Sequence, residues 1–244
     1  MSAPEGPVER AFLRPVALGE SVAPYRILRL VNGLIPMQNG DVLTSASADA
    51  LGARSVAAWL RDAETKWNEL SNKNPDGTPR LTLSESLDHL GKLTAQATRA
   101  PLRVLYTKSG TRLSACWIED EDVIVDQQAI WSAANSHEEA AYVSAVLNTD
   151  IVLERVKDLQ PVGQRDPRHF DNLVWTLPIP EFDATEALHL DIAAAAMHAA
   201  DVASRVELPE DRHFTTKRAL IREALVAEGV AQTIERLVDA LLPL

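Results

Sequence analysis

The chain has 244 residues, of which 46% are hydrophobic and 24% charged, a composition typical of a globular protein and not of a disordered chain. No apolar run approaches the roughly 20 residues needed to cross a bilayer, and the N-terminus lacks the basic and then apolar pattern of a signal peptide. The single cysteine, Cys116, cannot form an internal disulfide. We therefore expect a cytoplasmic protein.

The charge is unevenly distributed along the chain. The formal net charge of −11 opposes DNA binding, because neutralisation of phosphates supplies most of the affinity for DNA. Residues 1–115 contain 14 Lys/Arg and 11 Asp/Glu, whereas residues 116–244 contain 10 Lys/Arg and 24 Asp/Glu. This asymmetry fits a chain that presents one face to DNA and another to a protein partner. The alternative is that the second half is simply helical and well solvated.

The first 46 residues are rich in Pro, Gly and β-branched residues, and they predict short strands over Tyr25–Leu30, Gly33–Ile35 and Asp41–Thr44. Ser45 or Ser47 can then cap a helix that extends to about Asn72. Apolar residues recur at three- and four-residue steps from Leu51 to Leu70, which indicates one stripe of an amphipathic helix.

The middle of the chain predicts a second helix and a β-hairpin. Thr82 and Glu85 have capping-box spacing and open a predicted helix that ends at about Thr98. Leu102–Thr107 and Arg112–Ile118 alternate like strands on either side of a turn that contains a glycine, which predicts the hairpin. Val123–Asp126 predicts a third strand.

The remaining elements are mostly helical. Ser136 caps a predicted helix from about His137 to Leu147. Ile151–Leu159 fits a short helix or a strand, and Leu173–Leu177 predicts a strand. A long helix from about Thr185 to Val206 and two shorter ones are expected, the shorter ones over Thr215–Glu228 and Val230–Leu242 with Gly229 between them.

These elements predict an α+β fold with a strand-rich body and packed helices, followed by a long helix and two short C-terminal helices. We expect two domains. The first is an α+β domain over residues 1–183. The second is a helical C-terminal region over residues 184–244, which packs on the first domain or on a partner.

Motifs that carry catalysis are missing from the sequence. Asn74-Pro75-Asp76-Gly77 lacks the second proline and the aromatic residue of an adenine methyltransferase motif. All four residues favour turns, so a turn accounts for the segment. No glycine-rich nucleotide loop and no metal-ligand spacing is present. The acidic run 119–122 is either a solvated turn or a cation site. We expect a non-catalytic chain without cofactor or metal. The catalytic alternative is a site assembled from scattered residues such as His169, Asp171 and His189.

Two loops are candidates for DNA contact. Lys108, Ser109 and Arg112 lie on the tip of the predicted hairpin, where cations and hydroxyls can hold phosphates. The alternative is an exposed hairpin tip at which these cations serve only to keep the protein soluble. The second loop, residues 163–169, supplies side chains that pair with base edges; these are Gln164, Arg165 and Arg168. A structural loop with an Arg–Asp pair is the alternative there.

Several stretches, in this order and spacing, carry a resemblance over residues 8–240: 14–20, 24–26, 34–36, 103–111, 139–149, 165–170 and 175–180. Together they resemble the C-terminal target-recognition region of adenine DNA methyltransferases from restriction–modification and phage-defence systems. The exit Leu177-Pro178-Ile179-Pro180 before a long helix also resembles the specificity subunits of type I restriction enzymes.

The resemblance implies a module that recognises a sequence in double-stranded DNA and lacks a methyl-transfer site. Its expected partner is the catalytic subunit or domain of an adenine methyltransferase, because the methyltransferase domain that precedes this region in the family is missing from the chain. The alternative is an acidic protein-interaction subunit of a defence complex that makes no direct DNA contact.

Overall fold

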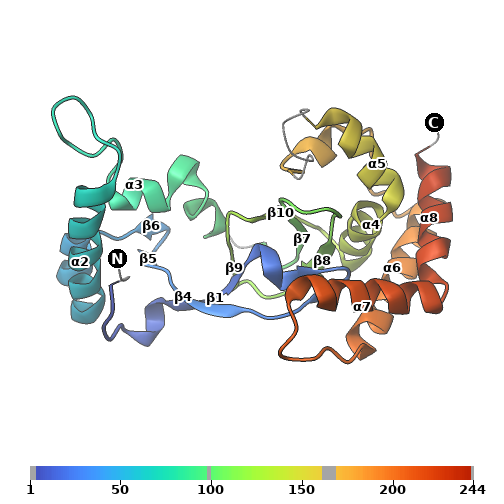
Figure 1. Ribbon diagram of the computed structural model, residues 1–244, viewed down its shortest axis with the longest axis horizontal. Coiled ribbons are helices and arrows are strands. Elements are labelled where there is room, and N and C mark those ends of the chain that lie inside the picture. Colours follow the sequence, from blue (N-terminus) through green and yellow to red (C-terminus); the bar gives the residue numbers. More distant parts are fainter. Residues whose placement is uncertain (1–3, 98–99, 161–168, 243–244) are drawn as a thin grey trace. The chain divides into compact units, whose positions relative to one another are not determined.

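The computed structural model describes residues 4–97, 100–160 and 169–242. Over these residues the chain has the predicted α+β fold (Figure 1). The helices are α1 Ser45–Ala50, α2 Arg54–Leu70, α3 Leu83–Leu87, α4 His137–Leu147, α5 Asp150–Leu159, α6 Ala187–Arg205, α7 Phe214–Ala227 and α8 Val230–Leu241. The strands are β1 Leu13–Ala17, β2 Val22–Ala23, β3 Arg26–Ile27, β4 Val31–Leu34, β5 Met37–Gln38, β6 Asp41–Val42, β7 Arg103–Thr107, β8 Ala115–Ile118, β9 Ile124–Val125 and β10 Ala129–Ala133. Within this described part, no helix is long and apolar enough to cross a membrane.

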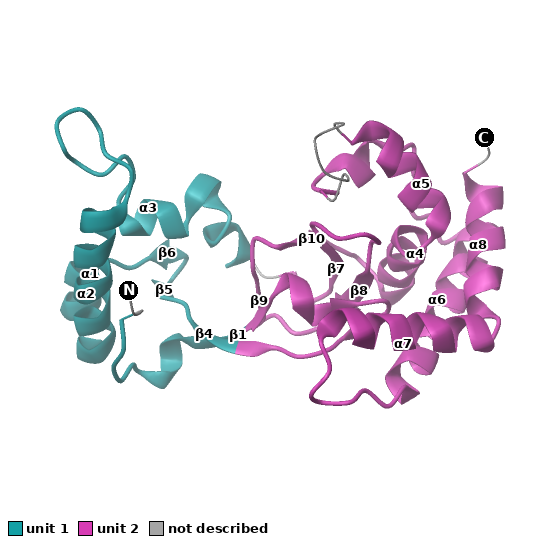
Figure 2. Ribbon diagram, in the orientation of Figure 1, with its two compact units in different colours: residues 1–15, 32–99 teal, residues 16–31, 100–244 magenta. Residues whose placement is uncertain are grey.

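The chain divides into two compact units (Figure 2). The first unit comprises residues 1–15 and 32–99, and the second unit comprises residues 16–31 and 100–244. The predicted boundary between residues 183 and 184 does not coincide with this division. The reason is long-range packing that the local pattern does not reveal: the Arg26 side chain donates hydrogen bonds to the carbonyls of Ala203 and Val206, and Arg218 donates to those of Val22 and Gly19.

The first unit is built around α1 and α2. The predicted single helix from residue 45 to 72 is interrupted, because Gly52 has a φ of 79° and ends α1. Such a left-handed glycine is a common helix terminator. The cap of α1 is Thr44, whose hydroxyl accepts a hydrogen bond from the Ser47 amide, and not the expected Ser45 or Ser47. The core of this unit includes Leu43, Ala48, Val56 and Leu60.

The second predicted helix is much shorter than expected. The capping box formed by Thr82 and Glu85 is present as predicted. However, α3 ends at Leu87, and two single turns of 3-10 helix follow it. The Asp88 carboxylate accepts hydrogen bonds from the Leu93 and Thr94 amides, so a side chain takes the donors that a continuous helix would have used.

The second unit contains an antiparallel sheet of order β10-β7-β8. The predicted hairpin is confirmed: Leu105 lies opposite Cys116 and Tyr106 opposite Ala115. β10 was not expected from the sequence, and it pairs with the other edge of β7. The predicted third strand is present as β9, but it runs parallel to β1 in a separate sheet of order β4-β1-β9. The gap between the predicted strands Tyr25–Leu30 and Gly33–Ile35 lies inside β4, which spans Val31–Leu34.

Helices cover this antiparallel sheet. α4 packs against β7, β8 and α6, and α6 packs against α8. Ser136 caps α4 as predicted, with its hydroxyl accepting from the Glu139 amide. The three expected C-terminal helices are confirmed as α6, α7 and α8, and Gly229 between the last two has a φ of 71°.

The predicted strand over Leu173–Leu177 is wrong. Residues Leu173–Thr176 form a 3-10 helix. The Leu173 amide donates to the Phe170 carbonyl and the Trp175 amide to the Asn172 carbonyl, so the segment satisfies its backbone within its own turns. Within this turn, Val174 is buried in the core whereas Trp175 is exposed.

Candidate nucleic-acid interface

The β7–β8 hairpin ends in an exposed tip that carries the first group of predicted DNA-binding residues. The Thr107 amide donates to the Ser114 carbonyl and closes the ladder, and the Lys108 amide donates to the Gln128 carbonyl. Ser109 and Arg112 are exposed and Lys108 is half-buried. The buried strands therefore fix the base of a polar tip.

Residues 169–171 lie directly against this tip. Ser109 and His169 form an antiparallel bridge, and the Phe170 and Asp171 amides donate to the Lys108 carbonyl over 2.8 and 3.3 Å. The Gln160 side-chain amide donates to the His169 carbonyl. Gln160 and His169 are the described residues on either side of 161–168. The structure thus places His169, the last residue of the second predicted loop, beside the hairpin tip.

The charge of Lys108 is balanced by an acid of this segment. Its Nζ atom lies 3.3 Å from Oδ1 of Asp171, and the two side chains are 38% and 50% exposed. Asp171 has a φ of 39°, a backbone region that asparagine and aspartate tolerate better than most residues. The Tyr106 hydroxyl donates to the Asp171 carbonyl over 2.7 Å and helps to hold this conformation. Burial raises the pKa of Tyr106, so this hydroxyl keeps its proton.

Trp175 adds an aromatic surface to the same region. Its ring packs edge-on against Tyr106, with ring centroids 5.7 Å apart and an angle of 76° between the planes. The side chain is still 42% exposed. Sequence reasoning did not select Trp175 as a site residue, because its segment was expected to be a strand. A large aromatic residue in a Pro-bounded exit segment is the signal that was available.

The remaining predicted DNA-binding residues are Arg112, which is described, and three residues of the second loop, which are not. Arg112 is engaged by both carboxylate oxygens of Asp150 at the start of α5, so Lys108 and Arg112 are paired with different acids. Gln164, Arg165 and Arg168 lie outside the described residues, and their assignment stays a prediction.

The residues of the scattered catalytic alternative are not brought together. His169 and Asp171 lie at the hairpin tip, whereas His189 is buried, with its Nδ1 accepting from the Asp183 amide and its ring against Tyr142. Cys116 is buried, and this burial raises the pKa of its thiol to about 12. A protonated thiol of this kind is a poor nucleophile. In the described ranges, no three His, Cys, Asp or Glu side chains cluster in a way that could hold a metal.

The sequence matches no described protein family and no curated protein. Comparison with solved structures gives a match to the Type IIL restriction-modification enzyme MmeI, whose structure was determined in complex with DNA. The match has a TM-score of 0.62 at 11% sequence identity and covers 95% of this chain. This chain shares its fold with part of a restriction-modification enzyme. It spans 28% of the MmeI chain, so the comparison with MmeI concerns one portion of that enzyme.

Proposed function

We propose that this chain is a DNA-sequence recognition module of a restriction–modification or phage-defence complex. In this proposal it performs no methyl transfer itself and acts with an adenine methyltransferase on another chain or domain. The fold shared with a portion of MmeI supports the proposal, because that enzyme was solved bound to DNA. The absence of methyltransferase and cofactor motifs in the sequence is consistent with a recognition role.

The observation that carries the proposal is the junction between the hairpin tip and residues 169–171. Two segments about sixty positions apart, each selected from sequence for DNA contact, meet through the Ser109–His169 bridge and the Lys108 carbonyl. Recognition surfaces combine groups that hold phosphates with groups that read bases. The His169 end of the second loop is thereby tied to the tip that carries the first group of residues, which supports a joint role in DNA contact.

In this account Lys108 and Ser109 hold the phosphate backbone. Gln164, Arg165 and Arg168 read base edges, since glutamine pairs with adenine and arginine with guanine. Arg112 serves as a second phosphate contact when its guanidinium, which is half exposed, turns outward from Asp150. Trp175 offers a rigid apolar surface to sugars or bases beside these groups.

The charge of the second unit limits how strongly it can bind DNA alone. It contains 15 Lys/Arg and 25 Asp/Glu, whereas the first unit contains 9 and 10. Phosphates can therefore be held only by a local group of cations. The electrostatic field of the whole unit, which is negative, opposes its association with DNA. We expect weak binding by the isolated chain and stronger binding when a methyltransferase partner adds its own phosphate contacts.

The proposal is tested by fluorescence anisotropy of the purified chain with a pool of randomised duplexes, at low and at near-physiological salt. Binding that weakens steeply with salt is expected, and the bound fraction should be enriched in one sequence after repeated selection. Arg165→Ala should relax the preference at one position of the selected site, at a cost of about 1–3 kcal/mol. Lys157→Ala on α5 is the matched control, because it removes an exposed cation outside the tip. Absence of binding at low salt would contradict DNA recognition by this chain alone.

The second candidate is an acidic protein-interaction subunit without direct DNA contact. The excess of 14 negative charges in residues 116–244 favours it. This candidate predicts that a complex with the methyltransferase binds DNA with unchanged affinity when Lys108 and Arg112 are replaced by alanine. The DNA-recognition proposal predicts a loss of affinity for the same complex.

A further inference from the structure

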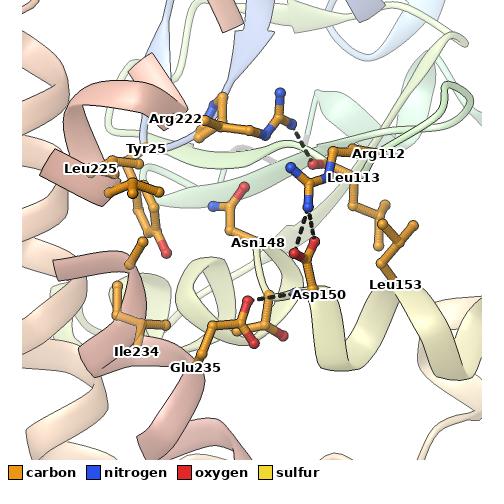
Figure 3. Close-up of a pocket in the computed structure, with 14 residues that line it drawn as sticks. Tyr25, Arg112, Leu113, Asn148, Asp150, Leu153, Arg222, Leu225, Ile234 and Glu235 are labelled. Atoms are coloured by element: carbon orange, nitrogen blue, oxygen red, sulfur yellow. Dashed lines mark hydrogen bonds and ion pairs between the residues drawn. The ribbon is translucent and has the colours of Figure 1, made fainter. Parts of the chain in front are cut away.

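A cavity of about 100 Å³ lies within the second unit (Figure 3). Five segments contribute to it: Tyr25 lies just before β3, Leu113 lies between β7 and β8, Asp150 is at the start of α5, Arg222 is on α7, and Glu235 is on α8. Leu113, Leu153, Leu225 and Ile234 give it apolar walls. Except for Arg112 at its rim, the cavity uses none of the residues assigned above to DNA.

The backbone of Tyr25 is held in an unusual conformation at this cavity. Its φ is 57°, a value that is rare for bulky residues. The Tyr25 amide donates to the Ala115 carbonyl over 2.8 Å, and the residue is buried. Figure 3 shows the Tyr25 ring among the residues that line the cavity, with its hydroxyl on the side where Glu235 lies. Backbone strain of this kind persists where the surrounding structure fixes it, often at ligand sites.

Two groups of opposite charge line the cavity without pairing with each other. Arg222 donates to the Leu113 carbonyl over 2.8 Å and to the Ser114 hydroxyl over 2.7 Å, and both of these partners are neutral. The Glu235 carboxylate accepts from the Asp150 amide over 2.6 Å. Among the described residues, no ion pair includes Arg222 or Glu235, whereas Arg112 and Asp150 neutralise each other.

These charges occupy different sides of the cavity. In Figure 3, Arg222 and Glu235 enter from opposite edges, and Tyr25 and Asn148 lie between them. The Asn148 side chain is occupied by the protein: its amide donates to the Ala115 and Ser144 carbonyls, its oxygen accepts from the Ala115 amide, and it also interacts with the Tyr25 side chain. It therefore shapes the cavity, and the available charged groups are the guanidinium and the carboxylate.

We propose that this cavity binds a small zwitterion of the amino-acid class. The ligand carboxylate would bind the Arg222 guanidinium, and its ammonium would bind the Glu235 carboxylate on the other side of the cavity. Charge-assisted hydrogen bonds of this kind are stronger than neutral ones. The ligand side chain would lie against Leu225 and Ile234, and the volume of about 100 Å³ restricts it to a few carbon atoms.

The test is isothermal titration calorimetry of the full chain, together with thermal shift, against alanine, serine, valine and leucine. Propionate and propylamine carry one charge each and serve as ligand controls. We expect at least one of the amino acids to bind, and each single-charge analogue to bind at least about tenfold more weakly, equivalent to the loss of about 1.4 kcal/mol.

Glu235→Gln removes the negative charge and keeps an oxygen that can accept from the Asp150 amide. It should weaken amino-acid binding by at least about tenfold. Glu223→Gln on α7, an exposed position outside the cavity, is the matched control and should leave the affinity unchanged. Arg222→Gln supplies a second variant at the other charge. DNA binding should be unaffected by Glu235→Gln, so the ligand proposal and the DNA proposal fail independently.

Three results would overturn the proposal. The first is no heat and no thermal shift with any of the four amino acids at millimolar concentration. The second is equal binding of the zwitterions and of an analogue with one charge. The third is the same affinity in Glu235→Gln, Glu223→Gln and the wild-type protein.

Discussion

The Lys108 ammonium lies 3.3 Å from the Asp171 carboxylate at the tip of the β7–β8 hairpin. Both side chains are partly exposed, so solvent screens the pair and its contribution to stability is small. The consequence for binding is larger. A DNA phosphate that approaches Lys108 competes with Asp171 for the same ammonium, and the negative charge of Asp171 also repels it.

Asp171→Asn should therefore increase DNA affinity. Asparagine tolerates the positive φ of residue 171, so the backbone hydrogen bonds to Lys108 should remain. We expect affinity to rise by about two- to fivefold, comparable with the energy of one exposed ion pair, up to about 1 kcal/mol. Anisotropy titrations at low salt measure it. Asp191→Asn on α6 makes the same charge change at an exposed position, and an equal increase in both variants would show that net charge alone is responsible.

Arg112→Ala should have little effect on folding. Arg112 and Asp150 are 47% and 56% exposed, so their ion pair contributes less than about 1 kcal/mol after screening by solvent. Urea denaturation monitored by circular dichroism gives the change in the free energy of unfolding. A loss above about 3 kcal/mol is typical of a broken buried pair and would contradict this exposed geometry.

Glu9→Gln should destabilise the first unit in a pH-dependent manner. The Glu9 carboxylate accepts hydrogen bonds of 2.8 Å from the Ser55 and Val56 amides in the first turn of α2. The bond from the Ser55 amide, together with other backbone bonds, lowers the pKa of Glu9 below its ordinary value of 4.5. Because the pKa of Glu9 is lowered in the folded protein, the ionised carboxylate stabilises the folded state at pH values above the ordinary pKa. This stabilisation is lost as the pH falls through the pKa of the folded state.

Urea unfolding of both proteins across the acidic range measures this effect. The wild type should be more stable than Glu9→Gln at neutral pH, and the difference should shrink on acidification. A difference that does not change with pH would show that the ionised carboxylate is not the group that caps α2.

Glu235→Gln should show the opposite pH dependence. Burial is the largest cause that raises the pKa of Glu235, and the hydrogen bond from the Asp150 amide partly offsets it. Because the pKa of Glu235 is raised in the folded protein, the protonated carboxyl favours the folded state. This stabilisation of the wild type is lost as the pH rises through the pKa of the folded state. The free energy of unfolding of Glu235→Gln, relative to wild type, should therefore increase between the acidic range and neutrality. A relative stability that falls over this range would contradict the direction of the pKa shift.

Features with local causes could be predicted from the sequence. The α4 helix begins after Ser136 because its hydroxyl accepts a hydrogen bond from the Glu139 amide, only three positions further along the chain. The β7–β8 hairpin follows from alternation and a short turn. The same reasoning selected Lys108 and Ser109, since the tip of a hairpin is exposed whatever the rest of the chain does.

Features with long-range causes could not be predicted. The division into units depends on Arg26 and Arg218, which bind carbonyls about 180 to 200 positions away in the sequence. The Asp171 partner of Lys108 and the Asp150 partner of Arg112 likewise come from other segments. A periodic pattern reports which residues are buried, but it does not identify the segments that bury them.

The most direct test of DNA recognition at the hairpin tip is the salt dependence of DNA affinity in the wild type and in Lys108→Ala. Each phosphate contact that is lost reduces the slope of log K against log salt by about 0.9. We predict that Lys108→Ala lowers the slope by about one such step and weakens binding to all duplexes alike, whereas Lys157→Ala changes neither. Identical slopes and affinities for the wild type and Lys108→Ala would contradict a phosphate contact at this tip.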